Sequence, residues 1–459
     1  MPLQINPTIF REYDIRGRVG EDITPAVTEA IARGYAWHLA RYGERRVIVG
    51  QDNRESSPRI RASVIKALVS SGCHVLDIGT VITPAFYFAR LHYGIDGGMM
   101  ITASHNPPEF NGFKLTRGFA TIYGEEIQEI RRFADRGEFT EGKGSLEQRD
   151  IVPAYREMLN TKIRLGSRRL RVVVDCGNGT ASLIAPEVLE DLGCEIVRLY
   201  CDSDPRFPHH HPDPVQPANL QDLIAAVREH RADLGVGFDG DGDRLGVVDD
   251  RGDILWGDLL MILFWREILP QHPGTVGIVE VKCSQALYEE IARLGGKPLF
   301  YRTGHSLIKA KMKELGAVFT GEMSGHMFFA DEYYGYDDAV YAAARLLRIL
   351  SNTKRRLSEM LADLPRYYAT PEIRADCPDD LKEKVVRQLT DALKREYPVV
   401  DVDGARVLFT DGWGLIRASN TQPALVIRAE AKTPDALGRI KRILEEKLSA
   451  FPEVGPVGW

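Results

Sequence analysis

Residues 45–79 read RRVIVGQDNRESSPRIRASVIKALVSSGCHVLDIG. A β-branched run comes first, followed by a polar turn, a helical stretch, a glycine and a second apolar strand. This order is typical of a βαβ unit whose two parallel strands are buried in one sheet. The pattern returns at residues 170–200, LRVVVDCGNGTASLIAPEVLEDLGCEIVRLY, and at residues 274–304, GTVGIVEVKCSQALYEEIARLGGKPLFYRTG. The repeat therefore predicts three related α/β domains.

The boundaries of several helices can also be predicted. Thr24-Pro25, Ser57-Pro58 and Thr83-Pro84 each place a hydroxyl before a proline. We expect the hydroxyl to cap the helix and the proline to occupy its first position. Gly72 and Gly94 follow the second and third of these helices, and glycine commonly ends a helix. These boundaries support helices that cover a largely parallel sheet.

The last part of the chain has a different pattern. A polar helix is expected over residues 379–395 and another over residues 434–448, with three strands between them. Asp411-Gly412 is typical of a hairpin turn. This order predicts a smaller C-terminal α+β domain built on an antiparallel sheet. The predicted domain ranges, three α/β domains and then the C-terminal domain, are 1–150, 151–255, 256–366 and 367–459.

The composition is that of an ordinary globular protein with several domains. The 459 residues are 44% hydrophobic and 27% charged, and the formal net charge of -6 leaves no basic excess for nucleic acid. The six cysteines are scattered without a CxxC pair. Neither a signal peptide nor an apolar run of membrane-spanning length is found. We expect a cytoplasmic protein that binds neither nucleic acid nor membranes, and a monomer, with a dimer left open.

The run TASHNP at residues 102–107 offers a nucleophile. Residues 97–101 should form a strand, and small side chains at its end expose the Ser104 hydroxyl where open α/β sheets carry their sites. A serine hydroxyl is a weak nucleophile that needs a base or a metal ion. The alternative is an ordinary loop in which Ser104 and Asn106 satisfy backbone groups.

Three carboxylates alternate with glycines in the run DGDGDR at residues 239–244. Asp239, Asp241 and Asp243 can direct oxygens to one centre while the glycines let the backbone bend, which suits Mg²⁺. An EF-hand is excluded because Arg244 stands where its glycine would be, and because strands flank the run. A solvated acidic turn is the remaining alternative.

Two further runs are suited to a sugar phosphate. Glu322 and Ser324 fall on the same side of an extended segment, where they can hold neighbouring hydroxyl groups. Residues 417–423, RASNTQP, combine a guanidinium fork, hydroxyls and turn amides into a cradle for phosphate, and Arg428 could add charge from the next strand. Each run is also compatible with an ordinary polar turn.

Together these motifs resemble those of the α-D-phosphohexomutases, and within them the bacterial phosphomannomutase/phosphoglucomutase group. The resemblance runs from FREYDIRG at residues 10–17 through TASHNP, NGFK, DGDGDR, VKCS, TGHSLIK and GEMSGH to RASNTQP, and covers nearly the whole chain. Several motifs in one order are far more specific than any single motif. The resemblance implies four domains around a central cleft, with one motif from each domain.

The resemblance also implies roles for individual residues. Ser104 would be the phosphoserine with His105 beside it, and its phosphate would hold Mg²⁺ together with the three aspartates. Glu322 and Ser324 would hold the sugar hydroxyls. The residues implied for the phosphate that does not react are Arg417, Ser419, Asn420 and Thr421. Further active-site positions are matched by Tyr13, Arg16, Lys114, Arg244, Lys282 and His305.

The implied function is reversible transfer of a phosphoryl group between the C1 and C6 oxygens of mannose or glucose phosphates. Phosphorylated Ser104 would form a hexose 1,6-bisphosphate intermediate, so glucose 1,6-bisphosphate is the expected activator. Lys114 and His305 are the candidates for general acid and base, and Arg16 would tune them. The alternatives are a phosphoglucosamine mutase of the same fold, a metal-dependent sugar phosphatase and a non-catalytic sensor of sugar phosphates.

Overall fold

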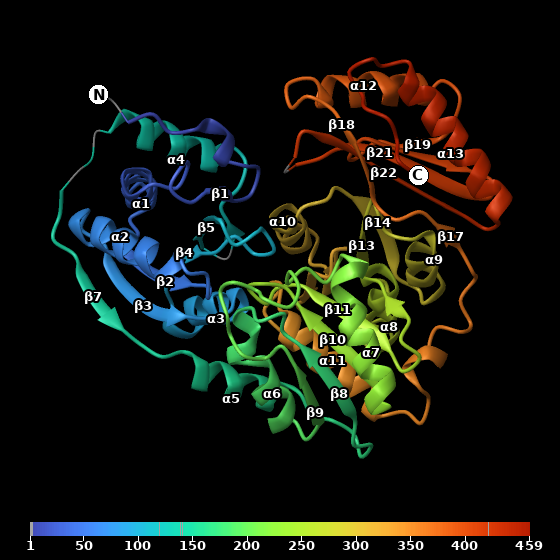
Figure 1. Cartoon of the computed structure of the whole chain (residues 1–459), viewed down its shortest axis with the longest axis horizontal. Helices are drawn as coiled ribbons and strands as arrows, with labels where there is room; N and C mark the ends of the chain where they lie inside the picture. Colours follow the sequence, from blue (N-terminus) through green and yellow to red (C-terminus); the bar gives the residue numbers. More distant parts are fainter. Residues whose placement is uncertain (1–2, 119, 138, 140, 421) are drawn as a thin grey trace. The chain divides into compact units, whose positions relative to one another are not determined.

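Two compact units make up the chain (Figure 1). The first consists of Met1–Phe264 and Ser324–Met360, and the second of Trp265–Met323 and Leu361–Trp459. The structure is a computed structural model that describes residues 3–118, 120–137, 139, 141–420 and 422–459.

A mixed seven-stranded sheet forms the N-terminal part of the first unit. Its strands are β1 Ile15–Arg18, β2 Arg46–Gln51, β3 His74–Thr80, β4 Gly97–Ile101, β5 Phe110–Arg117, β6 Ala120–Thr121 and β7 Ser145–Gln148. They lie in the order β1-β5-β4-β2-β3-β7, with β6 paired to β5. β2 is parallel to both β3 and β4, and β5 is antiparallel to β4 and β1. Val47, Ile48 and Val49 are fully buried because β2 is covered on both faces.

The helices of this part are η1 Pro7–Ile9, α1 Pro25–Ala40, α2 Ser57–Ser70, α3 Thr83–Tyr93 and α4 Glu125–Arg136. The βαβ unit predicted at residues 45–79 is confirmed as β2, α2 and β3. Thr24 caps α1 as expected, accepting a hydrogen bond from Val27 N. The cap predictions for Ser57 and Thr83 are wrong, because both residues lie inside their helices and their hydroxyls donate to Asp52 and Asp241 instead.

A second sheet occupies the middle of the first unit. Its strands are β8 Arg171–Asp175, β9 Glu195–Leu199, β10 Leu234–Phe238, β11 Leu245–Asp249 and β12 Ile254–Leu255. They lie in the order β12-β11-β10-β8-β9, and β8 is parallel to both β9 and β10. The parallel strands predicted at residues 170–200 are thus confirmed. The remaining elements are α5 Val152–Lys162, η2 Thr180–Leu183, α6 Ala185–Asp191, η3 Pro217–Leu220, α7 Gln221–His230, β16 Met327–Phe329, α11 Ala339–Ser351 and η4 Leu357–Glu359.

The second unit contains the third repeat and the C-terminal sheet. The repeat consists of β13 Val276–Glu280, α9 Gln285–Arg293 and β14 Lys297–Tyr301, and its two strands pair in parallel as predicted. Helix α8 Gly257–Ile268 leads into it, and α10 His305–Leu315 and β15 Phe319–Gly321 follow it. None of the described helices combines the length and the apolar character that crossing a membrane requires.

The C-terminal sheet is antiparallel, as expected for an α+β domain. Its strands are β17 Tyr368–Ala369, β18 Ile373–Asp376, β19 Val399–Val400, β20 Ala405–Phe409, β21 Gly412–Ala418 and β22 Ala424–Ala431, with helices α12 Lys382–Leu393 and α13 Pro434–Ser449. Buried Leu389, Ile416 and Ile440 join both helices to the sheet in one core. The hairpin between β20 and β21 turns one residue earlier than predicted, because Gly412 already pairs with Phe409.

A buried carboxyl group holds the start of α11. Asp338 accepts hydrogen bonds from Tyr155 Oη at 2.7 Å, Tyr333 Oη at 2.6 Å and Tyr341 N at 2.8 Å. Tyr155 belongs to α5, so the carboxyl links two helices of the first unit. Burial raises the pKa of Asp338 from 3.8 to about 6, in spite of these three donors.

The raised pKa makes the stability contribution of Asp338 depend on pH. The folded state binds the proton more tightly than the unfolded chain, so this contribution is present below the unfolded pKa and is lost as pH rises through the folded pKa. Between about pH 4.5 and about pH 7, the wild type should lose about 2 kcal/mol of unfolding free energy relative to Asp338→Asn. Urea unfolding at both pH values measures this change. The exposed substitution Asp135→Asn is the control, and a pH-independent difference for Asp338→Asn would contradict the assignment.

Candidate active site

The serine loop, residues 102–110, follows β4 and holds its hydroxyl inside the protein. Ser104 is 2% exposed, and its φ of 50° is a left-handed conformation that few residues other than glycine adopt. Its amide donates to Thr102 Oγ1 at 2.8 Å. Its Oγ donates to Asp239 Oδ2 at 2.8 Å and lies 3.2 Å from His105 Nδ1. The predicted nucleophile therefore faces the predicted metal ligands.

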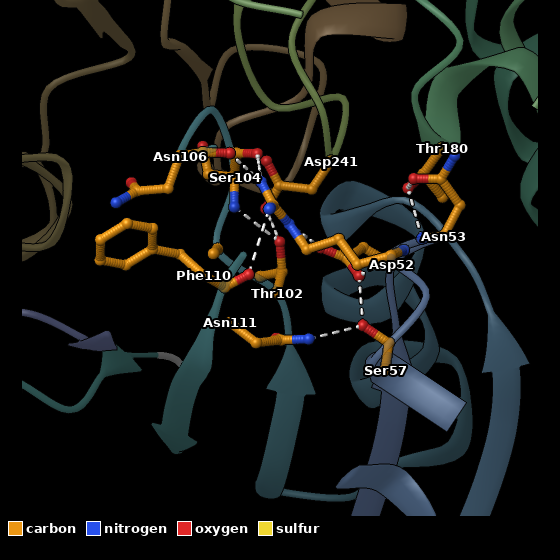
Figure 2. A network of polar contacts seen from close by, with 12 residues as sticks. Asp52, Asn53, Ser57, Thr102, Ser104, Asn106, Phe110, Asn111, Thr180 and Asp241 are labelled. Carbon is orange, nitrogen blue, oxygen red and sulfur yellow. Dashed lines mark hydrogen bonds and ion pairs between the residues drawn. The ribbon is translucent and has the colours of Figure 1, made fainter. Parts of the chain in front are cut away.

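Arg54 fixes the backbone of the serine loop. Figure 2 labels Ser104, Asn106 and Phe110 of this loop, whose carbonyl oxygens the side chain of Arg54 binds. The Arg54 guanidinium donates to the carbonyl oxygens of Ser104 at 2.7 Å, Asn106 at 2.5 Å, Pro107 at 2.6 Å and Phe110 at 3.1 Å. The side chain is 1% exposed. Such a fork of donors can hold several acceptors in one fixed arrangement.

The carboxylate of Asp52 balances the charge of the Arg54 guanidinium. Asp52 Oδ2 accepts from Arg54 Nε at 3.1 Å, and Ser57 Oγ donates to Asp52 Oδ1 at 2.5 Å. Arg54 was not among the residues predicted from the sequence. The run QDNR directly after the buried strand β2 could have indicated it, because polar residues at the carboxyl end of a parallel strand commonly line a site.

The acidic loop, residues 239–243, follows β10, and its three aspartates are fully buried. Asp241 Oδ2 accepts from Lys114 Nζ at 2.8 Å, and Lys114 also donates to Asp243 Oδ2. Asp239 Oδ1 accepts from the amides of Asp243 at 3.0 Å and Arg244 at 3.1 Å. The buried Asp241 Oδ1 has no hydrogen-bond partner among the residues that the structure describes.

The electrostatics of this loop favour a bound cation. Burial and the neighbouring carboxylates of Asp243 and Asp241 raise the pKa of Asp239. Burial opposes the charge of Asp243, but Lys114 and His326 hold its pKa well below the usual range. Each aspartate offers an oxygen within 4.8 Å of the others. Buried carboxylate oxygens close together, one of them unsatisfied, form a donor set that fits a hard divalent ion such as Mg²⁺.

Other predicted residues of the first unit lie next to these loops. Arg16 donates to Asn106 Oδ1 at 2.7 Å, which brings it to the serine loop. Arg244 Nε lies 3.3 Å from His326 Nε2, and Ser324 Oγ lies 3.1 Å from His326 Nδ1. His326 Nε2 is also 3.2 Å from Asp243 Oδ1. Residue Tyr13 is half-buried.

His326 is a site residue that was not predicted from the sequence. It stands in the quoted run GEMSGH, two residues after Ser324, so the same spacing rule could have included it. The neighbouring imidazole of His105 is held neutral, because burial first and then Arg244 and Arg16 keep its pKa well below the usual range.

The predicted binding residues of the second unit gather around residues 303–304. Glu322 Oε1 accepts from Gly304 N at 2.9 Å, and Asn420 Nδ2 donates to Thr303 O at 3.3 Å. Asp403 Oδ2 accepts from both Thr303 N at 3.0 Å and Arg417 Nε at 2.8 Å. The sugar run and the phosphate run are thus tied to one turn.

Glu280 joins the remaining residues of this unit and was also missed. It lies at the end of β13, fully buried, and accepts from Thr303 Oγ1 at 2.6 Å and Met323 N at 3.0 Å. Lys282 Nζ lies 3.3 Å from Glu280 and 3.1 Å from Glu372. The charge of Lys282 lowers the pKa of Glu372 to about 2.

Arg428, Ser419 and His305 are further predicted residues of the second unit. Arg428 donates to Lys282 O, and Ser419 Oγ accepts from Gln422 N at 3.2 Å. His305 is buried at the start of α10. Thr421 lies outside the described residues. That the residues of both units meet around one substrate stays a prediction.

Four family models match consecutive parts of the chain. They are phosphoglucomutase/phosphomannomutase α/β/α domain I at residues 7–141, domain II at 153–252, domain III at 256–368, and the C-terminal domain at 372–447. The chain is 45% identical over 451 residues to a Pseudomonas aeruginosa phosphomannomutase/phosphoglucomutase, covering 98% of this chain and 97% of that protein. It is 41% identical over 457 residues to a Neisseria gonorrhoeae phosphoglucomutase, covering 98% of each.

A solved structure gives the same result. The Burkholderia thailandensis phosphoglucomutase/phosphomannomutase family protein has a TM-score of 0.92 and 41% identity, and the match covers 97% of this chain and 98% of that one.

Arg54→Lys should loosen the serine loop while keeping the charge, because one ammonium group cannot reach four carbonyl oxygens. Each lost charged hydrogen bond costs about 1.5–3 kcal/mol, so amide exchange in the loop should rise on the order of tenfold or more. Hydrogen–deuterium exchange of peptides that cover the loop measures this. Arg59→Lys, an exposed substitution on helix α2, which begins three residues after Arg54, is the matched control. Equal exchange in the two variants would mean that Arg54 does not hold the loop.

Proposed function

The chain belongs to the phosphoglucomutase/phosphomannomutase family and is a hexose phosphate mutase, and from this premise we propose how its residues perform the reaction. We propose that phosphorylated Ser104 gives its phosphoryl group to a hexose monophosphate and recovers another from the resulting 1,6-bisphosphate. The observation that carries this proposal is the Ser104 hydroxyl, buried at the end of β4 and 2.8 Å from Asp239.

Each half of the proposed reaction breaks one phosphorus–oxygen bond and forms another. The phosphorus leaves Ser104 Oγ for the free hydroxyl of the sugar, whose proton goes to a base, while Ser104 Oγ takes up a proton from an acid. The neutral imidazole of His105, 3.2 Å from Oγ, supports a role in this proton exchange. Lys114 is held charged by Asp241 and Asp243, which raise its pKa in spite of its burial, so we propose it as a stabilising charge and an acid.

We propose that Asp239, Asp241 and Asp243, together with the phosphate on Ser104, hold Mg²⁺. The unsatisfied Asp241 Oδ1 and the purely oxygen donor set support this ion. When bound, Mg²⁺ would neutralise charge on the transferred phosphoryl group. Glucose 1,6-bisphosphate is the proposed activator, and a solved N-acetylphosphoglucosamine mutase from Aspergillus fumigatus was determined in complex with that compound.

Recognition of the substrate is assigned to the other predicted residues. We propose that Glu322 and Ser324 hold sugar hydroxyls of mannose or glucose, and that Arg16 and His305 assist proton transfer. The residues proposed for the phosphate that does not react, or for neighbouring sugar contacts, are Tyr13, Arg244, Lys282, Arg417, Ser419, Asn420, Thr421 and Arg428. The four domain ranges, a monomeric state and a cytoplasmic location also remain proposals.

Phosphorus NMR tests the function directly. Glucose 1-phosphate and mannose 1-phosphate, each with Mg²⁺ and a trace of glucose 1,6-bisphosphate, should both be converted to the 6-phosphates. Ser104→Ala should lose turnover to the detection limit, because no hydroxyl remains to carry the phosphoryl group. Wild-type turnover by this variant would refute the phosphoserine mechanism.

Other outcomes of the same experiment separate the alternatives. Release of inorganic phosphate alone would identify a phosphatase. No change of either sugar would make glucosamine 1-phosphate the next substrate, since the chain is also 36% identical over 433 residues to a probable phosphoglucosamine mutase from Methanopyrus kandleri.

Asp241→Asn should weaken the metal site without changing its shape. Loss of one carboxylate charge should raise the Mg²⁺ concentration needed for half-maximal activity by at least about tenfold. Asp253→Asn, an exposed and isosteric change in the same domain, is the matched control. Identical Mg²⁺ dependence in the two variants would remove Asp241 from the metal site.

A further inference from the structure

Two cysteines meet at the carboxyl ends of neighbouring parallel strands. Cys176 follows β8 directly, and Cys201 lies two residues beyond β9. The Cys201 thiol donates to Cys176 Sγ at 3.6 Å, and the sulfur also lies 3.3 Å from Val174 O and 3.4 Å from Leu199 O. We propose that Cys176 and Cys201 form a modification site, which a peroxide converts to a disulfide and a dithiol restores, and that this conversion lowers mutase activity.

The pair combines one accessible and one protected sulfur. Cys201 is partly exposed, whereas Cys176 is fully buried. A small peroxide can therefore reach Cys201 first, and Cys176 is in position to resolve the oxidised sulfur. A pair that consists of an accessible cysteine beside a resolving cysteine is the usual arrangement of redox-sensing thiols.

The chemistry balances with hydrogen peroxide as the oxidant. The Cys201 sulfur attacks the peroxide, the oxygen–oxygen bond breaks, and a sulfenic acid and one water form. The Cys176 sulfur then attacks the sulfenic sulfur, and the hydroxyl group leaves with the Cys176 proton as a second water. Two electrons pass from the two thiols to the peroxide. Burial raises the pKa of the Cys176 thiol, so the second step should be slow, on a scale of minutes to hours.

The disulfide would disturb the backbone between the strand and the acidic loop. A sulfur–sulfur bond is about 2.05 Å long, so the two sulfurs must approach each other by about 1.5 Å. Cys176 begins the glycine-rich turn, residues 176–180. Within this turn, Asn178 already donates to Tyr200 O at 2.8 Å from its backbone and to Asp202 O at 2.8 Å from its side chain. The turn and the Cys201 segment would therefore move together.

The same turn contacts the acidic loop. Thr180 N donates to Gly240 O at 2.9 Å, and Gly240 stands between Asp239 and Asp241. The contact is tight, since a Cβ on Gly179 would lie 3.2 Å from Gly240 Cα. A shift of the glycine-rich turn must therefore displace the backbone that carries the aspartates. Misplacement by about 1 Å near reacting groups can cost on the order of 10²-fold in rate, and we expect a loss of at least about tenfold.

Mass spectrometry tests the modification itself. In a Cys194→Ser background, trypsin separates Cys176 in the peptide 172–198 from Cys201 in the peptide 199–206. After hydrogen peroxide and digestion without reductant, the two peptides should be linked with the loss of two hydrogens. The link should be absent when Cys201→Ser is added. Recovery of unlinked peptides, or of sulfinic and sulfonic acids without a link, would overturn the proposal.

Activity measurements test the consequence, and they rest on the mutase function proposed above. Peroxide-treated protein should lose at least about tenfold in kcat and regain it with dithiothreitol, which does not repair methionine sulfoxide. Cys201→Ser should keep its activity after the same treatment. A disulfide between the two peptides without any loss of activity would refute the proposal that oxidation lowers mutase activity. If the protein shows no mutase activity before oxidation, the proposed function is refuted. Mass spectrometry of the linked peptides would still show whether the disulfide forms.

Discussion

The candidate active site depends on the hydrogen bonds of the buried Arg54 guanidinium, because they hold the serine loop through four backbone carbonyl oxygens. Backbone groups are bound, so the side chains of the loop stay available for chemistry. The loop can therefore keep Ser104 in an unfavourable left-handed conformation. Asp52 and Ser57 complete the network, and a buried charge without its partner would cost several kcal/mol. The network is stable only as a whole.

The acidic loop buries negative charge, whereas Arg54 buries a positive charge. Among the described residues, Lys114 pairs with Asp241 and Asp243, and Arg244 lies 4.0 Å from Asp239. Three buried carboxylates thus face two side chains of permanent positive charge, and the excess of negative charge suits a divalent cation. Lys114 stands on β5 and the aspartates follow β10, so charge joins the two sheets of the first unit. Threonines 83 and 102 add hydroxyl donors to Asp241 at 2.7 Å and 3.2 Å. The nucleophile and the carboxylates are thus fixed relative to each other before any ligand binds.

The sequence was sufficient for features that local patterns encode. The βαβ repeats, the antiparallel C-terminal sheet and the linear motifs around Ser104 and Asp241 all depend on residues close together in the chain. The run QDNR could indicate that Arg54 lies at a site, but the contacts of Arg54 and Glu280 could not be predicted, because their partners lie far along the chain or are backbone groups that any residue provides. The same limit explains Thr83, whose hydroxyl donates to Asp241 far along the chain instead of capping its helix. The partner of Ser57 is local, since its hydroxyl donates to Asp52 five residues earlier, and the cap preference alone did not reveal it.

The start of α3 has no side-chain cap, and this limits how the helix can be engineered. Its cap position is Ile82, which makes no side-chain cap, whereas Ser, Asp or Asn at such a position commonly adds about 1 kcal/mol. However, Ile82 packs against Gly242, since a Cβ added to Gly242 would lie 2.9 Å from the Cγ2 methyl group of Ile82. Thr83 N also donates a hydrogen bond to Asp241 O at 2.9 Å. The helix end is thus satisfied by the acidic loop. A polar cap installed here would remove the fully buried Ile82 side chain, and losing such a side chain costs about 2–5 kcal/mol, more than a cap adds. The same change would disturb the contact that holds the acidic loop, so this helix start should be left alone in a search for thermostable variants.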